Sequence, residues 1–335
     1  MEMRDIIIVG GGPAGLSAAI FTSLDGWDTL ILEGNWVGGQ AAIAYTVMNY
    51  PGFPPDDGAI LVENLKKQVT SPPPKGTGAE IRQEEAIEIN TEEKVIITEK
   101  NRYRAKAIIL ATGSNMQKLG VPGEKQFVDK GVTYYAKRDF DKFSGKRVLV
   151  VGGGNTTAKS AILAKKEGEA SEVIMVHRRR SLRVYDIMIK RLKKEGVEIW
   201  YNTEVKEIKG NDNVKAIKII NNKTNEAKEI DVDWIVICTG TEPDISLARQ
   251  TGLKIVEGYV KINEHMMTSE PGIFACGEIT GCARHLINAT AEGASAGMAT
   301  SQYLALEKAK KGEMFEGSKN GKYFEEYLQM LKQGG

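Results

Sequence analysis

Three glycines near the start of the chain are spaced to receive a phosphate group. Gly10, Gly12 and Gly15 follow the pattern G-x-G-x-x-G, directly after the apolar run 6–9, which is typical of a buried parallel strand. The first glycine of such a turn permits a tight bend, the second lets the backbone approach a pyrophosphate, and the third lets the next helix pack closely. Glu33 ends the following apolar run, where a carboxylate would bind a ribose hydroxyl. The spacing therefore predicts a dinucleotide site.

A second glycine-rich turn repeats this arrangement. Gly152 and Gly154 follow the apolar run 148–151, and Thr157 stands where a third glycine or an alanine is usual. The next apolar run, EVIMV, ends in a basic stretch without an acid at its tip, namely His177, Arg178, Arg179 and Arg183. Arginine side chains in this position bind a 2′-phosphate through charge-assisted hydrogen bonds. The second turn is therefore predicted to prefer NADP(H) over NAD(H), with an ordinary solvated basic surface as the alternative.

The repeated turn predicts two nucleotide-binding folds in one chain of 335 residues. The stretches AIILATGS and IVICTGTEPD each resemble the closing strand of a unit, and GIFACGEIT with the helical stretch after it resembles the missing end of the first unit. We therefore expect an α/β protein with two Rossmann-like three-layer domains, the second inserted into the first. The expected bounds are 1–117 with 245–311 for the first domain, 118–244 for the second, and 312–335 for a C-terminal extension.

Composition narrows the classes of partner. The net charge is +1 and 27% of the residues are charged, so no overall charge favours nucleic acid or an anionic membrane. No apolar run approaches the roughly 20 residues that a membrane span needs. The acidic Glu2 and Asp5 before a short apolar run are untypical of a signal peptide. We expect a cytoplasmic protein.

The three cysteines do not form a familiar reactive motif. Cys276 and Cys282 are separated by five residues, unlike the C-x-x-C spacing of redox dithiols, and Cys238 stands alone. No histidine is spaced to complete a zinc site, so no metal centre is expected. Buried or idle thiols are the simpler interpretation.

The motifs taken together resemble the low-molecular-weight thioredoxin reductase family, flavoproteins with FAD and NADPH domains. The matching stretches are GGGPAG, GGQ, the NYPGFP loop, ATG, GGGN, HRRxxxR, and a GE turn where the family has Gly-Asp. The resemblance implies FAD contacts at Gly10, Gly12, Pro13, Ala14, Gly15, Glu33, Gly39, Gln40, Thr112, Gly113, Gly277 and Glu278. It implies NADPH contacts at Gly152, Gly154, Asn155, Thr156, His177, Arg178, Arg179 and Arg183. Glu278 is one methylene longer than the family's aspartate, which the resemblance implies contacts the flavin ribityl chain.

The chain departs from this family where the family has its reactive Cys-x-x-Cys. Tyr135, Ala136, Lys137 and Arg138 stand there, and the family's following aspartate is kept as Asp139. Because a thiolate is the nucleophile in disulfide exchange, the ordinary thioredoxin reductase mechanism is excluded. Hydride transfer from NADPH to the flavin belongs to the cofactors and does not need the dithiol. The chain thus resembles the thioredoxin-reductase-type ferredoxin–NADP⁺ reductases, which implies a ferredoxin partner and a homodimer.

Four residues are candidates for a role beside the flavin. Tyr50 would stack on the ring, and His285 would lie near the pyrimidine edge; a turn tyrosine of the core and a structural histidine are the alternatives. Tyr323 or Phe324, on a helical apolar stripe in the C-terminal extension, would cover the flavin face. The alternative is a helix that packs on its own domain or on a dimer mate.

Basic residues cluster at and near positions 135–138, where the family has its dithiol. They would steer an acidic ferredoxin, and an ordinary solvated charged surface is the alternative. They are Lys137, Arg138, Lys142, Lys146 and Arg147. Two other functions stay open. One is an NAD(P)H oxidase that forms hydrogen peroxide, or a dye or quinone reductase. The other is a flavoprotein that senses nucleotide or redox state without useful turnover.

Overall fold

The computed structural model describes residues 1–312, which divide into two compact units that we describe separately. Unit 1 contains Met1–Ala42, Val47–Ser114 and residues 243–312, and unit 2 contains Ile43–Thr46 and Asn115–Glu242. The α/β fold with parallel sheets, with the second unit inserted into the first, confirms the predicted fold class. Within residues 1–312, no helix is long and apolar enough to cross a membrane.

Unit 1 is built on a seven-stranded sheet with the order β3-β2-β1-β6-β5-β4, in which β19 also pairs with β6. Strands β1, β2, β3, β6 and β19 run parallel, whereas β4 and β5 form an antiparallel extension. The carboxyl ends of β1, β2 and β6 therefore meet at one edge. The strands are β1 (Glu2–Val9), β2 (Thr29–Glu33), β3 (Glu80–Gln83), β4 (Ala86–Asn90), β5 (Val95–Thr98), β6 (Arg102–Leu110) and β19 (Ile273–Ala275).

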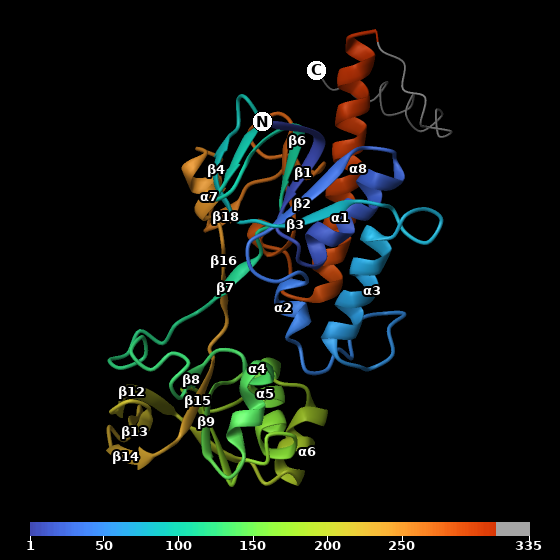
Figure 1. Ribbon diagram of the computed structural model, residues 1–335. Coiled ribbons are helices and arrows are strands. Elements are labelled where there is room, and N and C mark those ends of the chain that lie inside the picture. The colour runs from blue at the N-terminus through green and yellow to red at the C-terminus, as the bar shows by residue number, and fades with distance from the viewer. Residues whose placement is uncertain (313–335) are drawn as a thin grey trace. The chain divides into compact units, whose positions relative to one another are not determined.

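Two helices that are distant in sequence lie side by side in unit 1, as Figure 1 shows for α1 and α8. Their backbones approach closely, since a Cβ on Gly293 would lie 2.1 Å from the carbonyl oxygen of Ala14. Glycines on one helix face permit this approach. The helices are α1 (Pro13–Leu24), α2 (Gly39–Ala42), α3 (Gly58–Thr70), α7 (Ser246–Gln250) and α8 (Leu286–Lys310), with a 3₁₀ turn, η2, at Gly277–Thr280.

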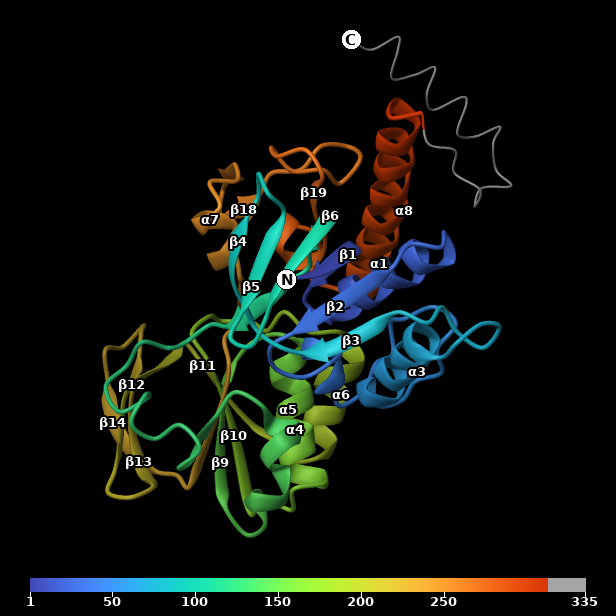
Figure 2. The same ribbon diagram turned by 45° about the horizontal axis from the view of Figure 1, so that its top comes forward.

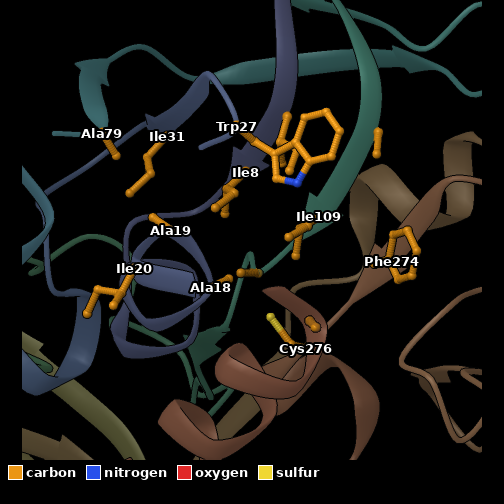
Figure 3. Close-up of a cluster of buried hydrophobic side chains, with 14 of the residues drawn as sticks. Ile8, Ala18, Ala19, Ile20, Trp27, Ile31, Ala79, Ile109, Phe274 and Cys276 are labelled. Atoms are coloured by element: carbon orange, nitrogen blue, oxygen red, sulfur yellow. The ribbon is translucent and has the colours of Figure 1, made fainter. Parts of the chain in front are cut away.

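The sheet of unit 1 carries an apolar core on each face because its central parallel strands are buried on both sides. Ile8 and Ile31 point to the side of α1 and α8, where Ala18 and Cys276 also lie (Figure 3). Neighbouring positions of the same strands, such as Ile7, face the opposite core. This double burial explains why the strand sequences are continuous apolar runs.

Unit 2 is a smaller parallel sheet with the order β11-β10-β9-β15-β8, beside a three-stranded antiparallel sheet, β12-β13-β14. Helices α5 and α6 lie along one side of the parallel sheet (Figure 2). The strands are β8 (Val132–Thr133), β9 (Arg147–Gly152), β10 (Glu172–His177), β11 (Glu198–Tyr201), β12 (Thr203–Gly210), β13 (Val214–Asn221), β14 (Ala227–Asp231) and β15 (Trp234–Cys238). The helices are α4 (Ala136–Asp139), η1 (Phe140–Phe143), α5 (Asn155–Lys166) and α6 (Asp186–Lys194).

Two short strands, β7 (Ser114–Met116) and β16 (Thr241–Pro243), pair where the chain leaves and re-enters unit 1. The backbone N–H of Asp244 donates to the carbonyl oxygen of Gly113 at 2.9 Å, and that of Gln117 donates to Gly240 at 2.9 Å. The two crossings are thus hydrogen-bonded on both sides of the boundary. A separate hairpin, β17 (Ile255–Val256) with β18 (Tyr259–Val260), belongs to unit 1.

Candidate functional site

The first glycine turn closes tightly on its own strand. Gly10 has φ +108°, and a Cβ there would lie 2.2 Å from the carbonyl oxygen of Ala111; a Cβ on Gly15 would lie 1.9 Å from the oxygen of Gly10. Gly12, in contrast, has open space where a Cβ would stand, and no side chain within residues 1–312 caps the N terminus of α1, which begins at Pro13 and Ala14. The uncapped helix start beside an open glycine fits a pyrophosphate, because its N–H groups and dipole attract anions.

Glu33 lies at the tip of β2, directly beside this turn. Its Oε2 accepts a hydrogen bond from the N–H of Gly11 at 2.7 Å, and its Oε1 accepts one from Asn35 at 2.8 Å. The side chain is buried, so both bonds fix the carboxylate at the edge of the sheet. Carboxylate oxygens accept more than one hydrogen bond each, so Glu33 keeps acceptor capacity for a ribose hydroxyl.

A hydrogen-bonded chain joins three further segments of unit 1. Gln40, at the start of α2, donates from Nε2 to Ser114 Oγ at 2.6 Å and to the Ser114 carbonyl at 3.0 Å. Ser114 Oγ in turn donates to Glu278 Oε2. Gly39 lies next to Gly12, because a Cβ on Gly39 would be 3.6 Å from the Cα of Gly12. The structure therefore brings GGQ and the GE turn to the first glycine turn; Ser114 itself was missed by the sequence motifs.

The GE turn is fixed from behind by α8. Glu292 Oε2 accepts hydrogen bonds from the backbone N–H of Gly277 at 2.9 Å and from Thr280 Oγ1 at 2.6 Å. Gly277 has φ +82°, and a Cβ there would lie 3.0 Å from the Cβ of Ala14. The sequence motifs did not predict a role for Glu292, because its carboxylate belongs to α8 and not to the GE turn that it binds.

The ATG stretch lies at the end of β6, and its threonine side chain is bonded to the segment by which the chain returns to unit 1. Thr112 Oγ1 donates to the carbonyl oxygen of Asp244 at 2.6 Å, and Gly113 adopts φ +70°. Gly10 approaches this stretch, since a Cβ on Gly10 would lie 3.1 Å from the backbone nitrogen of Thr112. Thr112 and Gly113 thus stand at the same sheet edge as the first glycine turn.

Two of the residues expected beside a flavin belong to segments that meet. His285 precedes α8 as its N-cap, and Asn49 Nδ2 lies 3.5 Å from His285 Nδ1. Asn49 adjoins Tyr50, which is partly buried in a loop closed by the pairing of Val47 with Asp56. The loop and the helix start therefore lie together in unit 1. Tyr323 and Phe324 lie outside the described residues.

The second glycine turn uses different contacts. Gly152 has φ +146°, and a Cβ there would lie 2.3 Å from the carbonyl oxygen of Cys238 and 2.4 Å from Thr157 Oγ1. Thr157 Oγ1 accepts from the N–H of Gly154 at 3.3 Å and donates to the carbonyl oxygen of Cys238 at 3.3 Å. Gly154 has open space at its Cβ position, as Gly12 has. The threonine therefore replaces close packing by hydrogen bonds and leaves the helix start, with Thr156 exposed, open to a phosphate.

The arginine stretch after β10, which we call the arginine loop (residues 178–183), is held beside this turn by its backbone. The N–H of Arg183 donates to the carbonyl oxygen of Gly153 at 2.8 Å. On the other side, Asn222 Nδ2 donates to the carbonyl oxygen of Arg178 at 2.7 Å, and the N–H of Asn202 donates to Arg179 at 3.2 Å. The side chains of Arg178, Arg179 and Arg183 are left exposed, as binding of a 2′-phosphate requires.

Asn155, at the start of α5, is bonded to the segment that follows the arginine loop. Its Oδ1 accepts a hydrogen bond from the N–H of Tyr185 at 3.0 Å. The first residue of α5 and the start of α6 are therefore held together at the second glycine turn. Asn155 thus lies at the open helix start, and its contact with NADPH stays a prediction.

His177, at the tip of β10, is buried under the turn rather than exposed with the arginines. A Cβ on Gly153 would lie 2.1 Å from its ring, and its Nε2 has no hydrogen-bond partner among the described residues. Burial lowers the pKa of His177, and the neighbouring Arg179 and Arg183 lower it further, against a hydrogen bond with the backbone of Ser181. The ring is therefore neutral at pH 7 and supports the turn from below.

The segment that carries Tyr135, Ala136, Lys137 and Arg138 forms the short helix α4 around a buried carboxylate. Asp139 is 1% exposed and accepts from Thr133 Oγ1 at 2.7 Å, from Arg138 at 2.8 Å and from Lys142 at 2.6 Å. Burial would raise the pKa of Asp139, but these hydrogen bonds outweigh burial and the pKa is lowered. Arg138 also lies over the ring of Tyr135, 5.5 Å from its centroid.

Carboxylates accompany most of the basic residues near α4. Arg138 also pairs with Asp129, Lys146 lies 4.0 Å from Asp233, and Arg147 lies 2.5 Å from Glu172. Five basic residues (137, 138, 142, 146 and 147) thus lie among five acids (129, 139, 141, 172 and 233), which leaves a local charge of 5 − 5 = 0. The acids at 129, 172 and 233 come from other segments, so the sequence showed only part of this charge balance. Because the charges are balanced, the steering potential of this surface is small.

None of the three thiols is set up as a nucleophile. Burial raises the pKa of Cys238 to about 11 and that of Cys282 to about 12, and it also raises the pKa of the buried Cys276. Each thiol is therefore protonated at neutral pH, whereas the thiolate is the reactive form. In the described part of the chain, no group of three or more His, Cys, Asp or Glu could hold a metal ion.

Comparison with known proteins assigns this architecture to a family. Residues 4–293 match the pyridine nucleotide-disulphide oxidoreductase family. The chain is 36% identical to the thioredoxin reductase of Peptoclostridium litorale over 315 residues, covering 90% of this chain and 98% of that protein. The structure of T. acidophilum thioredoxin reductase matches with a TM-score of 0.83 at 30% identity, covering 90% of this chain and 98% of that one.

A third comparison concerns a relative with a different electron donor in its name. The structure of a ferredoxin-flavin thioredoxin reductase from Clostridium acetobutylicum matches with a TM-score of 0.50 at 28% identity, over 91% of this chain and 99% of that one. Thioredoxin reductases use FAD and NADPH, and the open glycine turns of both units fit these cofactors. The chain therefore belongs to the pyridine nucleotide-disulphide oxidoreductase family and is an FAD-dependent oxidoreductase that uses NADPH.

Proposed function

We propose that the protein passes electrons between NADPH and a ferredoxin through FAD, without the dithiol step of ordinary thioredoxin reductases. FAD would be held by the first glycine turn and NADPH by the second, at the residues that the motifs name, except that the buried His177 would support the second turn from below. The bound cofactors supply the hydride transfer and the single-electron steps. The chain's own residues bind the two nucleotides and set their orientation.

The observation that carries the proposal is the state of the thiols. Residues 135–138 contain no cysteine, and each of the three cysteines in the chain has a raised pKa. No described thiol is thus ready for disulfide exchange, so electrons from the flavin must leave directly to an external acceptor. The name of the Clostridium acetobutylicum relative supports a ferredoxin as the class of partner.

The near-balanced charges around α4 predict how the association with ferredoxin should depend on salt. If an acidic ferredoxin used this surface, its association would depend only weakly on salt, because Asp139, Asp129 and their neighbours neutralise most of the basic residues. A steep salt dependence would locate the docking surface elsewhere. The proposal also includes a homodimer, as the family resemblance implies. Light scattering of the purified protein, which measures its molar mass in solution, tests this.

The test is an anaerobic stopped-flow experiment on the holoenzyme. The enzyme is reduced with NADPH and mixed with oxidised ferredoxin while the flavin and iron–sulfur absorption bands are followed, and the mixing is repeated with aerated buffer. Reoxidation by ferredoxin much faster than by oxygen supports the proposal. Reoxidation by oxygen alone overturns it and favours an oxidase, or a dye or quinone reductase if quinones reoxidise the flavin. A flavin that NADPH fails to bleach indicates a nucleotide sensor.

A further inference from the structure

Glu278 occupies its position with one more rotatable bond than an aspartate would have. A longer carboxylate has more rotamers to lose when it is fixed, so it needs a partner to hold it. The structure supplies that partner: Ser114 Oγ donates to Glu278 Oε2. Within residues 1–312 no hydrogen bond reaches the second oxygen, Oε1, and the side chain is partly exposed.

The hydroxyl of Ser114 is itself oriented. Gln40 Nε2 donates to Ser114 Oγ at 2.6 Å, so that oxygen accepts from the amide and gives its proton to the carboxylate. The second bond from Gln40, 3.0 Å to the Ser114 carbonyl, fixes the amide plane. Hydrogen bonds that run in one direction through a hydroxyl strengthen each other.

The backbone of the same turn is fixed independently. Glu292 accepts from the N–H of Gly277 at 2.9 Å and from Thr280 Oγ1 at 2.6 Å, so the Cα of Glu278 is held from the side of α8. One end of the Glu278 side chain is thus anchored by its turn and the other end by Ser114. Its Oε1 remains as an acceptor at the edge that carries the first glycine turn.

We propose that Ser114, oriented by Gln40, is a positioning residue that directs Glu278 so that Oε1 accepts a hydrogen bond from a ribityl hydroxyl of FAD. The inference deepens the proposed function, because it rests on FAD binding in unit 1. In this proposal Ser114 holds the longer side chain that glutamate has compared with aspartate. An aspartate at position 278 would not reach Ser114, so the serine would then not affect FAD binding.

The experiment measures FAD binding to the full-length apoprotein by flavin fluorescence, for the wild type, Ser114→Ala, Glu278→Asp and the double variant. Ser114→Ala is expected to weaken binding about tenfold, which corresponds to about 1.4 kcal/mol. The same change made in the Glu278→Asp background is expected to have an effect below about twofold. Ser114→Thr, which keeps the hydroxyl, is expected to restore most of the affinity.

Controls separate positioning from folding. Ser295→Ala removes a hydroxyl that bonds within α8, at 3.0 Å from the oxygen of Ala291, and should leave FAD affinity unchanged. Gln40→Ala is expected to weaken FAD binding in the same direction as Ser114→Ala, but by less. Thermal unfolding of each apoprotein shows whether the variants fold equally well, and the absorption spectrum of the bound flavin reports a changed environment.

Two results overturn the inference. The first is a Ser114→Ala variant that binds FAD as tightly as the wild type. The second is a loss of FAD affinity on Ser114→Ala that is equal in the wild-type and Glu278→Asp backgrounds. Neither result contradicts the proposed function, provided that the wild-type protein binds FAD and its flavin is reduced by NADPH. A wild-type chain that fails to bind FAD would overturn both.

Discussion

The two glycine turns share one backbone plan and differ in what supports it. In unit 1 the residue at the tip of the second strand is Glu33, which accepts from the N–H of Gly11. In unit 2 the residue in the corresponding place is His177, whose ring lies against Gly153. One turn is thus bonded to a charged acceptor, and the other rests on a neutral ring whose Nε2 has no partner within residues 1–312. The tip residue distinguishes the two turns while the strand and helix stay the same.

The third position of the turn shows the second difference. Gly15 places its helix against the oxygen of Gly10, whereas Thr157 bonds Gly154 and Cys238 through its hydroxyl. A helix that packs against a glycine has no space for an added Cβ. A hydrogen bond, in contrast, can be removed at a limited cost in stability. The two turns should therefore respond unequally to substitution.

The largest effect is expected for Gly15→Ala. The new Cβ would lie 1.9 Å from the Gly10 carbonyl oxygen, a rigid backbone atom, so unit 1 should be destabilised by about 3 kcal/mol or more. Denaturant unfolding of the full chain measures this. Gly12→Ala is the matched control, because its Cβ meets open space at φ −72°; it should fold normally but bind FAD more weakly. Equal destabilisation by both changes would contradict the comparison.

A smaller effect is expected for Thr157→Val in the second turn. Valine keeps the shape of threonine but leaves the N–H of Gly154 and the oxygen of Cys238 without the hydroxyl, which should lower the free energy of unfolding by about 1–2 kcal/mol. Chemical denaturation is again the measurement, with the exposed neighbour Thr156→Val as its control. A loss as large as that of Gly15→Ala would show that both turns rely on packing.

The pH response should also separate the turns. Because burial lowers the pKa of His177, the unfolded chain binds its proton more readily than the folded chain. The stability from this group is complete above the unfolded pKa of about 6.5, and it is lost as the pH falls below that value toward the folded pKa. When the pH falls from 7.5 to 5.5, the free energy of unfolding of the wild type should decrease by about 1 kcal/mol or less through this group. A His177→Gln variant should not show this decrease. Parallel curves for the two proteins would exclude this role.

The smallest effect concerns the arginine loop. Asn222→Ala removes the hydrogen bond to the carbonyl oxygen of Arg178, so the loop is less well placed for a 2′-phosphate while its charges remain. The KM for NADPH should rise about twofold to threefold with little change in kcat, as for a loss of uniform binding. The KM for NADH, which lacks the phosphate, should stay constant. Equal changes for both nucleotides would mean that Asn222 acts on the whole unit.

The sequence predicted those parts of the site that lie within one local pattern. The spacing of Gly10, Gly12 and Gly15 follows from the turn that strand and helix require, so it marks the site without a structure. Ser114, Glu292 and Asn222 act across sheet edges or helices, and their contacts are set by tertiary packing that no local spacing encodes. Asp129, Glu172 and Asp233, which pair with basic residues near α4 from other segments, were not found from the sequence for the same reason.

The paired crossings β7 and β16 have a consequence for engineering. Residues 115–242 leave and return at a single place, where hydrogen bonds join Gly113 to Asp244 and Gln117 to Gly240. An insertion with adjacent ends can be excised and replaced, because the host sheet closes without it. If unit 2 binds NADPH as proposed, a chimera that receives another insert at these two positions would exchange the coenzyme preference as a module.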